Sequence, residues 1–246
     1  MHQELANATF RIQCGDSTGS GFSFRNNRIV VTNCHVIRPA VGKIYVAPPI
    51  VAITEGGMAI PAKLLGISPE DKYDFAILEL QTDLPAGRHV LQPCAKRPAR
   101  GSKVIFAGFP HGLHDLLVHE AIVSGPSQNF GFYLDGSVNG GNSGGPIISA
   151  ESGEIVGIVT ARRFPGNQDL QAMSNEVMTL EKQVQLMRDG GGRIAIGGID
   201  FGGLMQLMNG SLRVISEIIE LNANSGIGIG YHIEYLNNAY DHAKLP

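Results

Sequence analysis

The most informative part of this chain is a glycine-rich stretch that reads Asp135-Gly136-Ser137-Val138-Asn139-Gly140-Gly141-Asn142-Ser143-Gly144-Gly145-Pro146. Glycines surround Ser143, so no side chain obstructs the backbone there, and the neighbouring N–H groups can point at a negative charge that develops on a reacting oxygen. The pattern suits a nucleophilic serine. Taken alone it also suits a plain loop, because Gly, Asn and Ser are ordinary turn residues.

Two other polar residues stand beside apolar runs that are typical of buried strands. His35 follows the run at 28–32, and a histidine buried at such a place needs either a hydrogen bond or a function. Asp74 directly precedes the apolar run at 75–80. Taken singly, His35 reads as a satisfied core residue and Asp74 as a turn residue at a strand edge. The three residues occur along the chain in the order His35, Asp74, Ser143. This order becomes informative about function when it is combined with the other motifs given below.

Short apolar or alternating runs, separated by turn residues, continue along the chain to about residue 160. They predict strands at 9–13, 22–24, 28–32, 43–47, 60–65, 75–80, 103–108, 120–124, 130–134, 146–149 and 154–159. Glycine accounts for 32 of 246 residues, and it favours turns and close backbone approach over helix interiors. Many short strands with turns between them predict an all-β fold, a sandwich or a barrel.

Composition excludes several classes of function. The net charge is −3, from 19 basic and 22 acidic residues, and no long run of either sign provides the basic surface that nucleic acid or an anionic membrane requires. No apolar stretch is long enough to cross a membrane as a helix. We therefore expect neither a nucleic-acid partner nor a membrane partner.

The cysteines and the first residues bear on the compartment of the protein. Cys14, Cys34 and Cys94 are odd in number and lack the spacing of a zinc site, so reduced thiols are expected, with a Cys14–Cys94 disulfide as the open alternative. Residues 1–5 lack the basic and apolar regions of a secretory signal. Both observations predict a cytoplasmic location.

As a set, the motifs resemble the trypsin-like serine proteases, most closely the Deg/HtrA branch. The matching pieces are Gly19-Ser20-Gly21-Phe22, Thr32-Asn33-Cys34-His35-Val36, Asp74-Phe75-Ala76-Ile77-Leu78, Gly141-Asn142-Ser143-Gly144-Gly145-Pro146, Gly157-Ile158-Val159-Thr160 and Ser225-Gly226-Ile227-Gly228-Ile229-Gly230-Tyr231. The resemblance spans about residues 8–162 and 224–236, and so many motifs in register make it highly specific. Many relatives carry a PDZ domain after the protease domain, and none is expected here.

The resemblance implies an all-β fold of two six-stranded antiparallel β-barrels, with the site in the cleft between them. The whole chain, 1–246, would be a single peptidase unit. Its parts would be an N-terminal barrel at 6–90, a C-terminal barrel at 101–162 and 223–236, a mostly helical insertion at 163–222 and a C-terminal helix at 234–243. Amphipathic apolar stripes indicate the helices of the insertion.

The resemblance also implies the chemistry of the site. Ser143 attacks the scissile carbonyl, His35 takes its proton and later gives it to the leaving amine, and Asp74 holds the imidazole in the required tautomer. Backbone N–H groups of Gly141 and Ser143 form the oxyanion hole. Asp71 is excluded as the acid, because the register of the Asp-Phe-Ala-Ile-Leu motif selects Asp74. The implied activity is that of a serine endopeptidase.

No metal or organic cofactor is expected. His111 and His114 stand at a spacing found in helical metal sites, but the Pro and Gly residues around them predict a loop of ordinary solvated residues. Cys34, next to the histidine, reads as a small buried residue, with a redox switch as the less favoured interpretation.

Substrate selection is implied by the same resemblance. The substrate-binding residues would be Ser137 at the floor of the S1 pocket, Val138 beside it, Gly230 at a wall, and Thr160, Ala161 and Arg162 along the edge that pairs with the substrate backbone. No aspartate stands at position 137, so a preference for Lys or Arg is disfavoured. We expect small or medium apolar P1 residues such as Ala, Val or Leu.

Several alternatives stay open. The insertion at 163–222 either packs on the barrel or on a second subunit as a surface elaboration, or it is a lid or docking element for a regulatory protein. A homo-oligomer is compatible with both interpretations. Besides an active endopeptidase acting on protein or peptide substrates, the chain could be a latent protease activated by a partner or by oligomerisation, or a non-catalytic protein-binding module.

Overall fold

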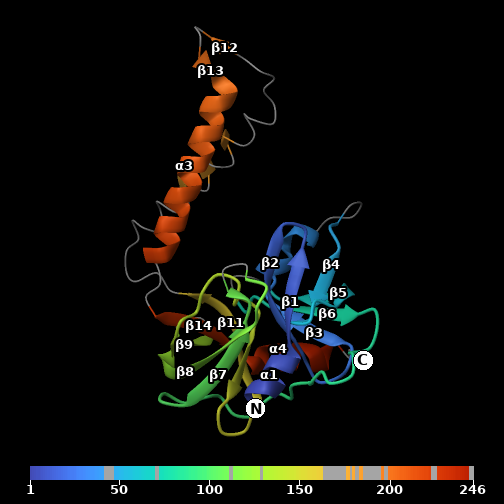
Figure 1. Ribbon diagram of the computed structural model, residues 1–246. Helices are drawn as coiled ribbons and strands as arrows, with labels where there is room; N and C mark the ends of the chain where they lie inside the picture. Colours follow the sequence, from blue (N-terminus) through green and yellow to red (C-terminus); the bar gives the residue numbers. More distant parts are fainter. Residues whose placement is uncertain are drawn as a thin grey trace. The chain divides into compact units, whose positions relative to one another are not determined.

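The computed structural model describes residues 1–41, 47–69, 72–110, 113–127, 130–162, 176–177, 179–180, 183–184, 195–196, 199–222 and 226–243. The chain divides into two units, Met1–Arg162 with Gly226–Pro246, and Arg163–Ser225. The first unit contains both β-barrels (Figure 1). Described elements of the second unit are a short hairpin and a long helix, β12 (Ala195–Ile196), β13 (Ile199–Asp200) and α3 (Phe201–Asn222). Most of the strand predicted at 43–47 and of the predicted helical segment before residue 199 lies outside the described residues.

The first barrel closes in the strand order β1-β2-β3-β6-β5-β4, with antiparallel neighbours throughout. Its strands are β1 (Thr9–Cys14), β2 (Ser17–Ser23), β3 (Ile29–Thr32), β4 (Ile50–Ile53), β5 (Ala59–Ile67) and β6 (Ala76–Leu80). The end of β3 pairs with the start of β6, where Thr32 lies opposite Ala76. This pairing brings the residues just after β3 close to the residues just before β6.

The second barrel closes in the order β10-β11-β14-β9-β8-β7, again antiparallel. Its strands are β7 (Lys103–Gly108), β8 (Leu117–Pro126), β9 (Gly131–Asp135), β10 (Pro146–Ser149), β11 (Ile155–Arg162) and β14 (Ile227–His232). β14 follows the second unit in sequence and fits between β11 and β9. Two closed six-stranded barrels confirm the predicted fold class.

Several strands bury apolar side chains on both faces. In β3, Val30 points into the first barrel, whereas Ile29 and Val31 join a core that the two barrels share. In β10, Ile147 lies inside the second barrel and Ile148 belongs to the shared core. Because successive side chains of a strand point to opposite faces, a continuous apolar run is what a strand buried on both sides requires. The shared core thus joins the barrels along a seam.

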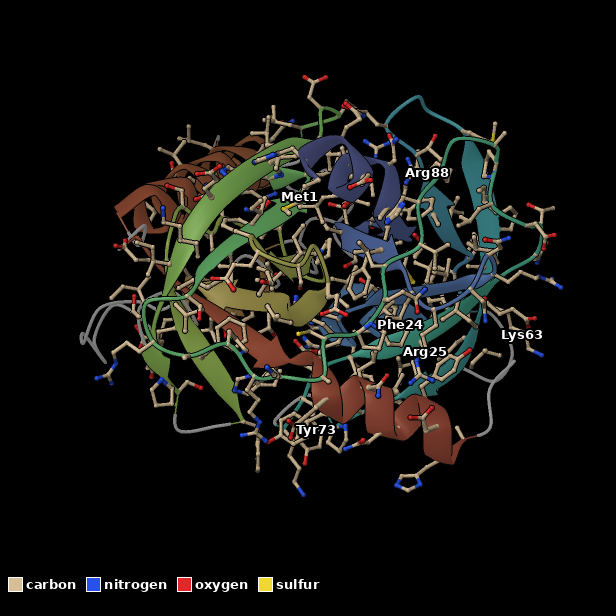
Figure 2. All side chains as sticks on the ribbon, turned by 90° about the horizontal axis from the view of Figure 1, so that it is seen from below. Met1, Phe24, Arg25, Lys63, Tyr73 and Arg88 are labelled. Atoms are coloured by element: carbon tan, nitrogen blue, oxygen red, sulfur yellow. The ribbon has the colours of Figure 1, made fainter. Side chains whose placement is uncertain are left out.

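Terminal helices cover the shared core. α1 (His2–Ala8) contributes Leu5 to it, and α4 (Ile233–His242) contributes Leu236. Figure 2 shows α4 along one side of the first unit, near the labelled Phe24 and Arg25. Arg25 forms an ion pair with Asp241 of α4 at 2.5 Å. Within the described part of the chain, no helix is both long and apolar enough to span a membrane.

Two histidines, His119 half-buried and His232 buried, should make the stability of the fold depend on pH. The His119 ring stacks on Phe106 with ring centroids 4.8 Å apart, and burial lowers the pKa of His119. His232 is 8% exposed, and burial, assisted by the charge of Arg97, lowers its pKa against the opposing effect of Glu234. Neither Nε2 of His119 nor Nδ1 of His232 has a hydrogen-bond partner among the described residues.

We expect the free energy of unfolding to fall between about pH 7.5 and about pH 5.5. Histidines of the unfolded chain, with pKa values near 6.5, bind more protons in this range than His119 and His232 do in the fold, so protons favour unfolding. The loss begins near the ordinary pKa and is complete below the lowered pKa values of the folded state. Urea unfolding at the two pH values measures it. The double variant His119→Phe, His232→Phe should depend less on pH, and an unchanged dependence would contradict this account.

Candidate active site

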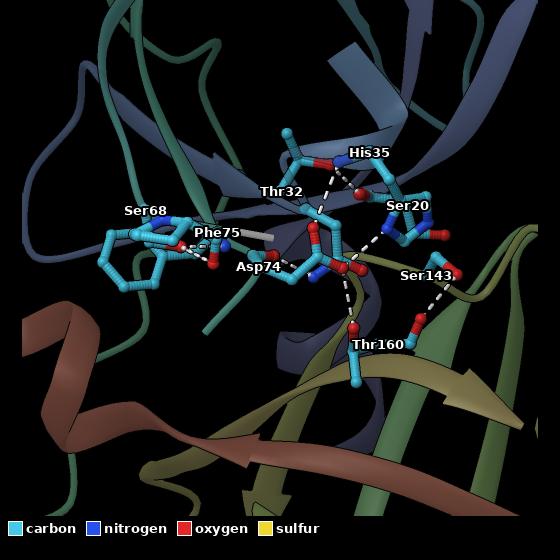
Figure 3. A network of polar contacts seen from close by, with 10 residues as sticks. Ser20, Thr32, His35, Ser68, Asp74, Phe75, Ser143 and Thr160 are labelled. Carbon is cyan, nitrogen blue, oxygen red and sulfur yellow. Dashed lines mark hydrogen bonds and ion pairs between the residues drawn. The ribbon is translucent and has the colours of Figure 1, made fainter. Parts of the chain in front are cut away.

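Four polar residues meet at the seam between the barrels (Figure 3). His35 begins the short 3₁₀ helix η1 (His35–Ala40) just after β3, and Asp74 lies just before β6. Ser143 lies in the loop between β9 and β10, and Thr160 belongs to β11. The first barrel therefore supplies the histidine and the aspartate, and the second barrel supplies the serine and the threonine.

The Asp74 carboxylate is buried, with its side chain 8% exposed, and it accepts three hydrogen bonds. Its Oδ1 accepts the backbone N–H of His35 at 3.1 Å, and its Oδ2 lies 2.6 Å from Nδ1 of the His35 ring. Oδ2 also accepts the Thr160 hydroxyl at 2.8 Å. A carboxylate can only accept, so Nδ1 carries the proton and Nε2 of His35 is left able to accept one.

The backbone of Asp74 is held as firmly as its side chain. Its φ of +44° lies in the left-handed region, where Asp and Asn are the commonest residues after glycine. Its carbonyl oxygen accepts the side-chain amide of Asn33 at 2.6 Å and the N–H of Cys34 at 3.3 Å. Asn33 is fully buried, and buried polar groups are normally hydrogen-bonded. The bond to Asp74 therefore explains why a polar residue stands at the end of an apolar strand.

Ser143 is joined to the same cluster through Thr160. The Ser143 hydroxyl donates to the carbonyl oxygen of Thr160 at 3.2 Å, and among the described hydrogen bonds none links it to the His35 ring. Thr160 therefore contacts Ser143 through its backbone and Asp74 through its hydroxyl. Thr160 thus links Ser143 to Asp74, and Asp74 in turn binds His35.

The loop before Ser143 forms a tight turn. The N–H of Asn142 donates to the carbonyl oxygen of Asn139 at 3.1 Å, and Gly141 has a φ of +96°, as the third residue of a type II turn requires. A Cβ atom at Gly141 would lie 2.2 Å from the carbonyl oxygen of Phe109, so only glycine fits. Among the described hydrogen bonds, the amides of Gly141 and Ser143 donate to no protein acceptor.

Ser20 fastens this loop to the first barrel. Its N–H donates to the carbonyl oxygen of Ser143 at 2.8 Å, and its hydroxyl donates to the carbonyl oxygen of Gly141 at 2.7 Å. The same hydroxyl accepts the N–H of Phe109 at 3.0 Å. Gly144, with a φ of +85°, lets the backbone approach so closely that a Cβ atom would lie 2.2 Å from the Ser20 carbonyl oxygen.

The residues predicted to form the S1 pocket are placed differently from one another. Ser137 is exposed, whereas Val138 is 2% exposed and belongs to the core of the second barrel. A Cβ atom at Gly230 would lie 2.5 Å from Cδ1 of Ile147, so that face of Gly230 points into the barrel core. Gly228 is the glycine that faces Val138, because its Cβ would lie 2.3 Å from Cγ2 of Val138.

The predicted substrate edge lies on β11. Ala161 and Arg162 pair with Ile229 and Gly228 of β14, while their side chains lie outside the described part of the chain. The register shifts between Val159 and Ala161, which leaves Thr160 out of the ladder with β14. Such a bulge re-aims a side chain, and here the Thr160 hydroxyl reaches Asp74 instead of a neighbouring strand.

Sequence reasoning missed three supporting features. They are the side-chain amide of Asn33, the hydroxyl of Ser20, and the absence of a side chain at Gly228, which faces Val138. The first two stand inside the quoted motifs, where a polar residue interrupts glycines or apolar residues. This interruption is the sequence signal that could have identified Asn33 and Ser20 as supporting residues. Gly228 gave no signal of its own, because its place opposite Val138 follows from strand register.

Other predictions have simpler outcomes. None of the three cysteines, all of which lie in the described part of the chain, takes part in a disulfide, so the Cys14–Cys94 disulfide is not formed. Cys34 is 3% exposed. Asp71 and His111 lie outside the described residues. Within the residues that the structure does describe, no three His, Cys, Asp or Glu side chains are grouped as metal ligands.

Comparison with known proteins agrees with this geometry. Residues 19–158 match the trypsin-like peptidase domain family. A probable periplasmic serine endoprotease, DegP-like, from Brucella suis is 32% identical over 182 residues, which cover 70% of this chain and 33% of that protein. A relative of the same name from Chlamydia trachomatis is 31% identical over 152 residues, or 58% of this chain and 28% of that protein. The chain thus spans about a third of the length of these relatives.

Solved structures are similar as well. The crystal structure of the serine endoprotease from Yersinia pestis has a TM-score of 0.55 and 26% identity, covering 76% of this chain and 66% of that one. An HtrA-type protease, AlgW, solved with a tripeptide, has a TM-score of 0.59 at 19% identity and covers 96% of this chain and 60% of that one. At that identity the second structure shows similarity of fold alone.

The predicted cytoplasmic location is wrong, because the relatives are named periplasmic endoproteases. The prediction used the first residues of the chain and its three cysteines, which are odd in number. Secretory signals are removed in mature proteins, and free thiols do not by themselves require a reducing compartment, so neither feature determines the location.

Proposed function

Since the chain belongs to the trypsin-like peptidase family, with relatives of the Deg/HtrA type, we propose that it is a serine endopeptidase that hydrolyses protein substrates outside the cytoplasm. One observation carries the proposal. Asp74 binds both the ring of His35 and the hydroxyl of Thr160, and the carbonyl of Thr160 binds Ser143. A base, an orienting acid and a nucleophile are therefore connected through hydrogen bonds at the seam of the two barrels, with Thr160 as the link between Asp74 and Ser143.

Peptide hydrolysis begins when Oγ of Ser143 attacks the scissile carbonyl carbon. Nε2 of His35 takes the hydroxyl proton, and the Asp74 carboxylate, 2.6 Å from Nδ1, stabilises the imidazolium that forms. The tetrahedral intermediate collapses to an ester on Ser143 as His35 gives this proton to the leaving amine. Water then attacks the ester, with His35 again as base, and restores the Ser143 hydroxyl. Before the first step, the hydroxyl turns from the Thr160 carbonyl toward His35.

The negative charge of the intermediate needs donors near Ser143. The amides of Gly141 and Ser143 supply them in this proposal, and their lack of a described protein acceptor supports that role. The type II turn with Gly141 at its third position supports it too, because a type I turn would rotate the peptide between Gly140 and Gly141 by about half a turn. Each such donor contributes roughly 10²–10³-fold in kcat.

The proposed enzyme prefers small or apolar residues at P1. Val138 is buried, and the serine at position 137, the proposed floor of the pocket, offers no carboxylate to a Lys or Arg side chain. Digestion of unfolded casein and of a peptide library, with the cleavage sites read by mass spectrometry, tests both the activity and the preference. We expect cleavage after Ala, Val or Leu. Cleavage mainly after Lys or Arg would overturn the preference, and no cleavage would count against the activity.

One observation favours a second candidate, a latent form of the same protease. The Ser143 hydroxyl donates to the Thr160 carbonyl at 3.2 Å in this structure, which is a resting arrangement rather than a reactive one. A partner protein, an oligomer or the substrate itself that stabilises the turned hydroxyl would shift the population toward the active form. The two candidates differ in whether the isolated chain is active.

A regulatory partner or a second copy of the chain would dock on the segment 163–222 in this proposal. Support comes from α3, which leaves several large apolar side chains exposed, among them Leu204, Leu207, Met208, Val214 and Ile215. Apolar residues gathered on one solvent-exposed helix are typical of interaction surfaces.

A further inference from the structure

A small cavity opens between the first two strands and the loop after β7. It has a volume of about 250 Å³ and is lined by Arg11, Gln13, Thr18, Gly19, Phe109 and His114. This volume is below the range of pockets that enclose a whole small-molecule ligand, and it suits one or two side chains of a bound peptide.

The cavity adjoins the backbone that holds the proposed nucleophile. Gly19 lines it, and a Cβ atom at Gly19 would lie 3.1 Å from the carbonyl oxygen of Ser143. Phe109 also lines it, and its carbonyl oxygen would lie 2.2 Å from a Cβ atom at Gly141. An extended peptide advances roughly 3.3–3.6 Å per residue, so a peptide bound at Ser143 reaches the cavity within a few residues.

The lining residues place the cavity beside the part of the substrate that follows the scissile bond. In the proposed binding mode, residues before the scissile bond lie along β11, with the P1 side chain near Val138. The scissile carbon lies at the Ser143 hydroxyl, so the peptide after the bond leads away from β11. The cavity is lined by β1, β2 and the loop after β7, with no residue of β11 or β14 among those described.

The cavity carries a positive charge that no described carboxylate neutralises. Arg11 stands on β1 between Phe10 and Ile12, which are fully buried in the first barrel, so its side chain faces outward. Its guanidinium donates to Nδ1 of His114. None of the ion pairs found among the described residues includes Arg11. A guanidinium remains charged at all working pH values, and its planar donors match a carboxylate.

From this charge and position we infer that the cavity binds an acidic side chain within the first three substrate residues after the scissile bond. Arg11 is then a residue that determines specificity, and His114 positions its guanidinium. The inference rests on the proposed endopeptidase function. It assigns to the protease a preference that the P1 pocket does not provide.

Internally quenched peptides that share one sequence up to P1 and carry Glu, Gln or Lys in turn at P1′, P2′ or P3′ test the inference. We expect wild-type kcat/KM to be about fivefold higher for Glu than for Gln at one of these positions, the size of a favourable exposed ion pair. About 0.5 M salt should reduce the difference by screening. Arg11→Gln should remove the preference, Arg11→Glu should reverse it toward Lys, and Arg100→Gln, an exposed arginine outside the cavity, should leave it unchanged.

A coumarin amide with the same residues up to P1 has no peptide after the scissile bond. It therefore distinguishes a failure of the inference about Arg11 from a failure of the proposed endopeptidase function. Arg11 variants that are folded should hydrolyse it at the wild-type rate. If the wild type hydrolyses this amide but shows no preference for Glu, or if Arg11→Glu keeps the wild-type preference, the inference is wrong and the endopeptidase function stands. If the folded wild type hydrolyses neither kind of substrate, the isolated chain is not an active endopeptidase, and the inference that rests on this activity is overturned with it.

Discussion

Ser143→Ala is expected to abolish peptide hydrolysis, with kcat falling about 10⁶-fold, because the variant keeps His35 and Asp74 but has no nucleophile. The fold should survive the change. The hydroxyl has one described hydrogen bond, to the Thr160 carbonyl at 3.2 Å, and losing such a bond costs about 1 kcal/mol. Turnover of a fluorogenic peptide and urea unfolding, measured on the same preparations, separate loss of chemistry from loss of structure.

Ser152→Ala is the matched control for this variant. Ser152 is exposed in the turn between β10 and β11, where its hydroxyl accepts the N–H of Glu154 at 3.2 Å. It removes the same atom far from any proposed reacting group, so activity should stay at the wild-type level. A Ser143→Ala protein that retains most of its turnover would show that hydrolysis, if present, uses another nucleophile.

Asp74→Asn should lower kcat about 10⁴-fold while leaving the fold intact. Asparagine has the same shape and tolerates the left-handed φ of +44° at this position, which alanine would not. Its amide nitrogen, however, donates where the carboxylate oxygen accepted. Facing Nδ1 of His35 at 2.6 Å, it would force the tautomer that carries the proton on Nε2, and that nitrogen could no longer accept the Ser143 proton.

The loss in Asp74→Asn should shrink at high pH, where hydroxide can take over part of the role of the base. Profiles of kcat/KM against pH for the wild type, Asp74→Asn and Asp71→Asn measure this. Asp71→Asn removes the same charge three residues earlier in the chain and should keep wild-type activity. Equal losses in both variants would indicate a general effect of charge and would contradict the orienting role of Asp74.

The fold was predictable because its evidence is local. Runs such as 29–31 and 75–78 are apolar at successive positions, and a strand with cores on both faces requires that pattern. The residues of the candidate site could be proposed from the sequence for a related reason, since the positive φ values at Gly141 and Gly144 and the contacts of their backbone leave no room for another residue. Each of these requirements falls on a single position, so the residue type at that position indicates it directly.

Features that depend on register or on distant pairing could not be read in this way. The bulge between Val159 and Ala161 turns Thr160 toward Asp74, and the local sequence contains no pattern that predicts this bulge. The choice of Gly228 rather than Gly230 as the neighbour of Val138 depends on how β14 aligns with β9 and β11. No local pattern singles out Arg11 either, because the loop after β7 that carries His114 lies beside it only in the folded chain.

Reaction of the purified protein with a fluorescent fluorophosphonate tests most directly whether Ser143, His35 and Asp74 form a working site. In this reaction the Ser143 oxygen bonds to phosphorus, fluoride leaves, and His35 takes the hydroxyl proton. At about pH 8, where an ordinary histidine is neutral, we expect one adduct on the peptide that contains Ser143, located by mass spectrometry, and none in folded Ser143→Ala. A folded wild-type protein that stays unlabelled, or a label on another residue, would contradict an assembled catalytic site in this chain.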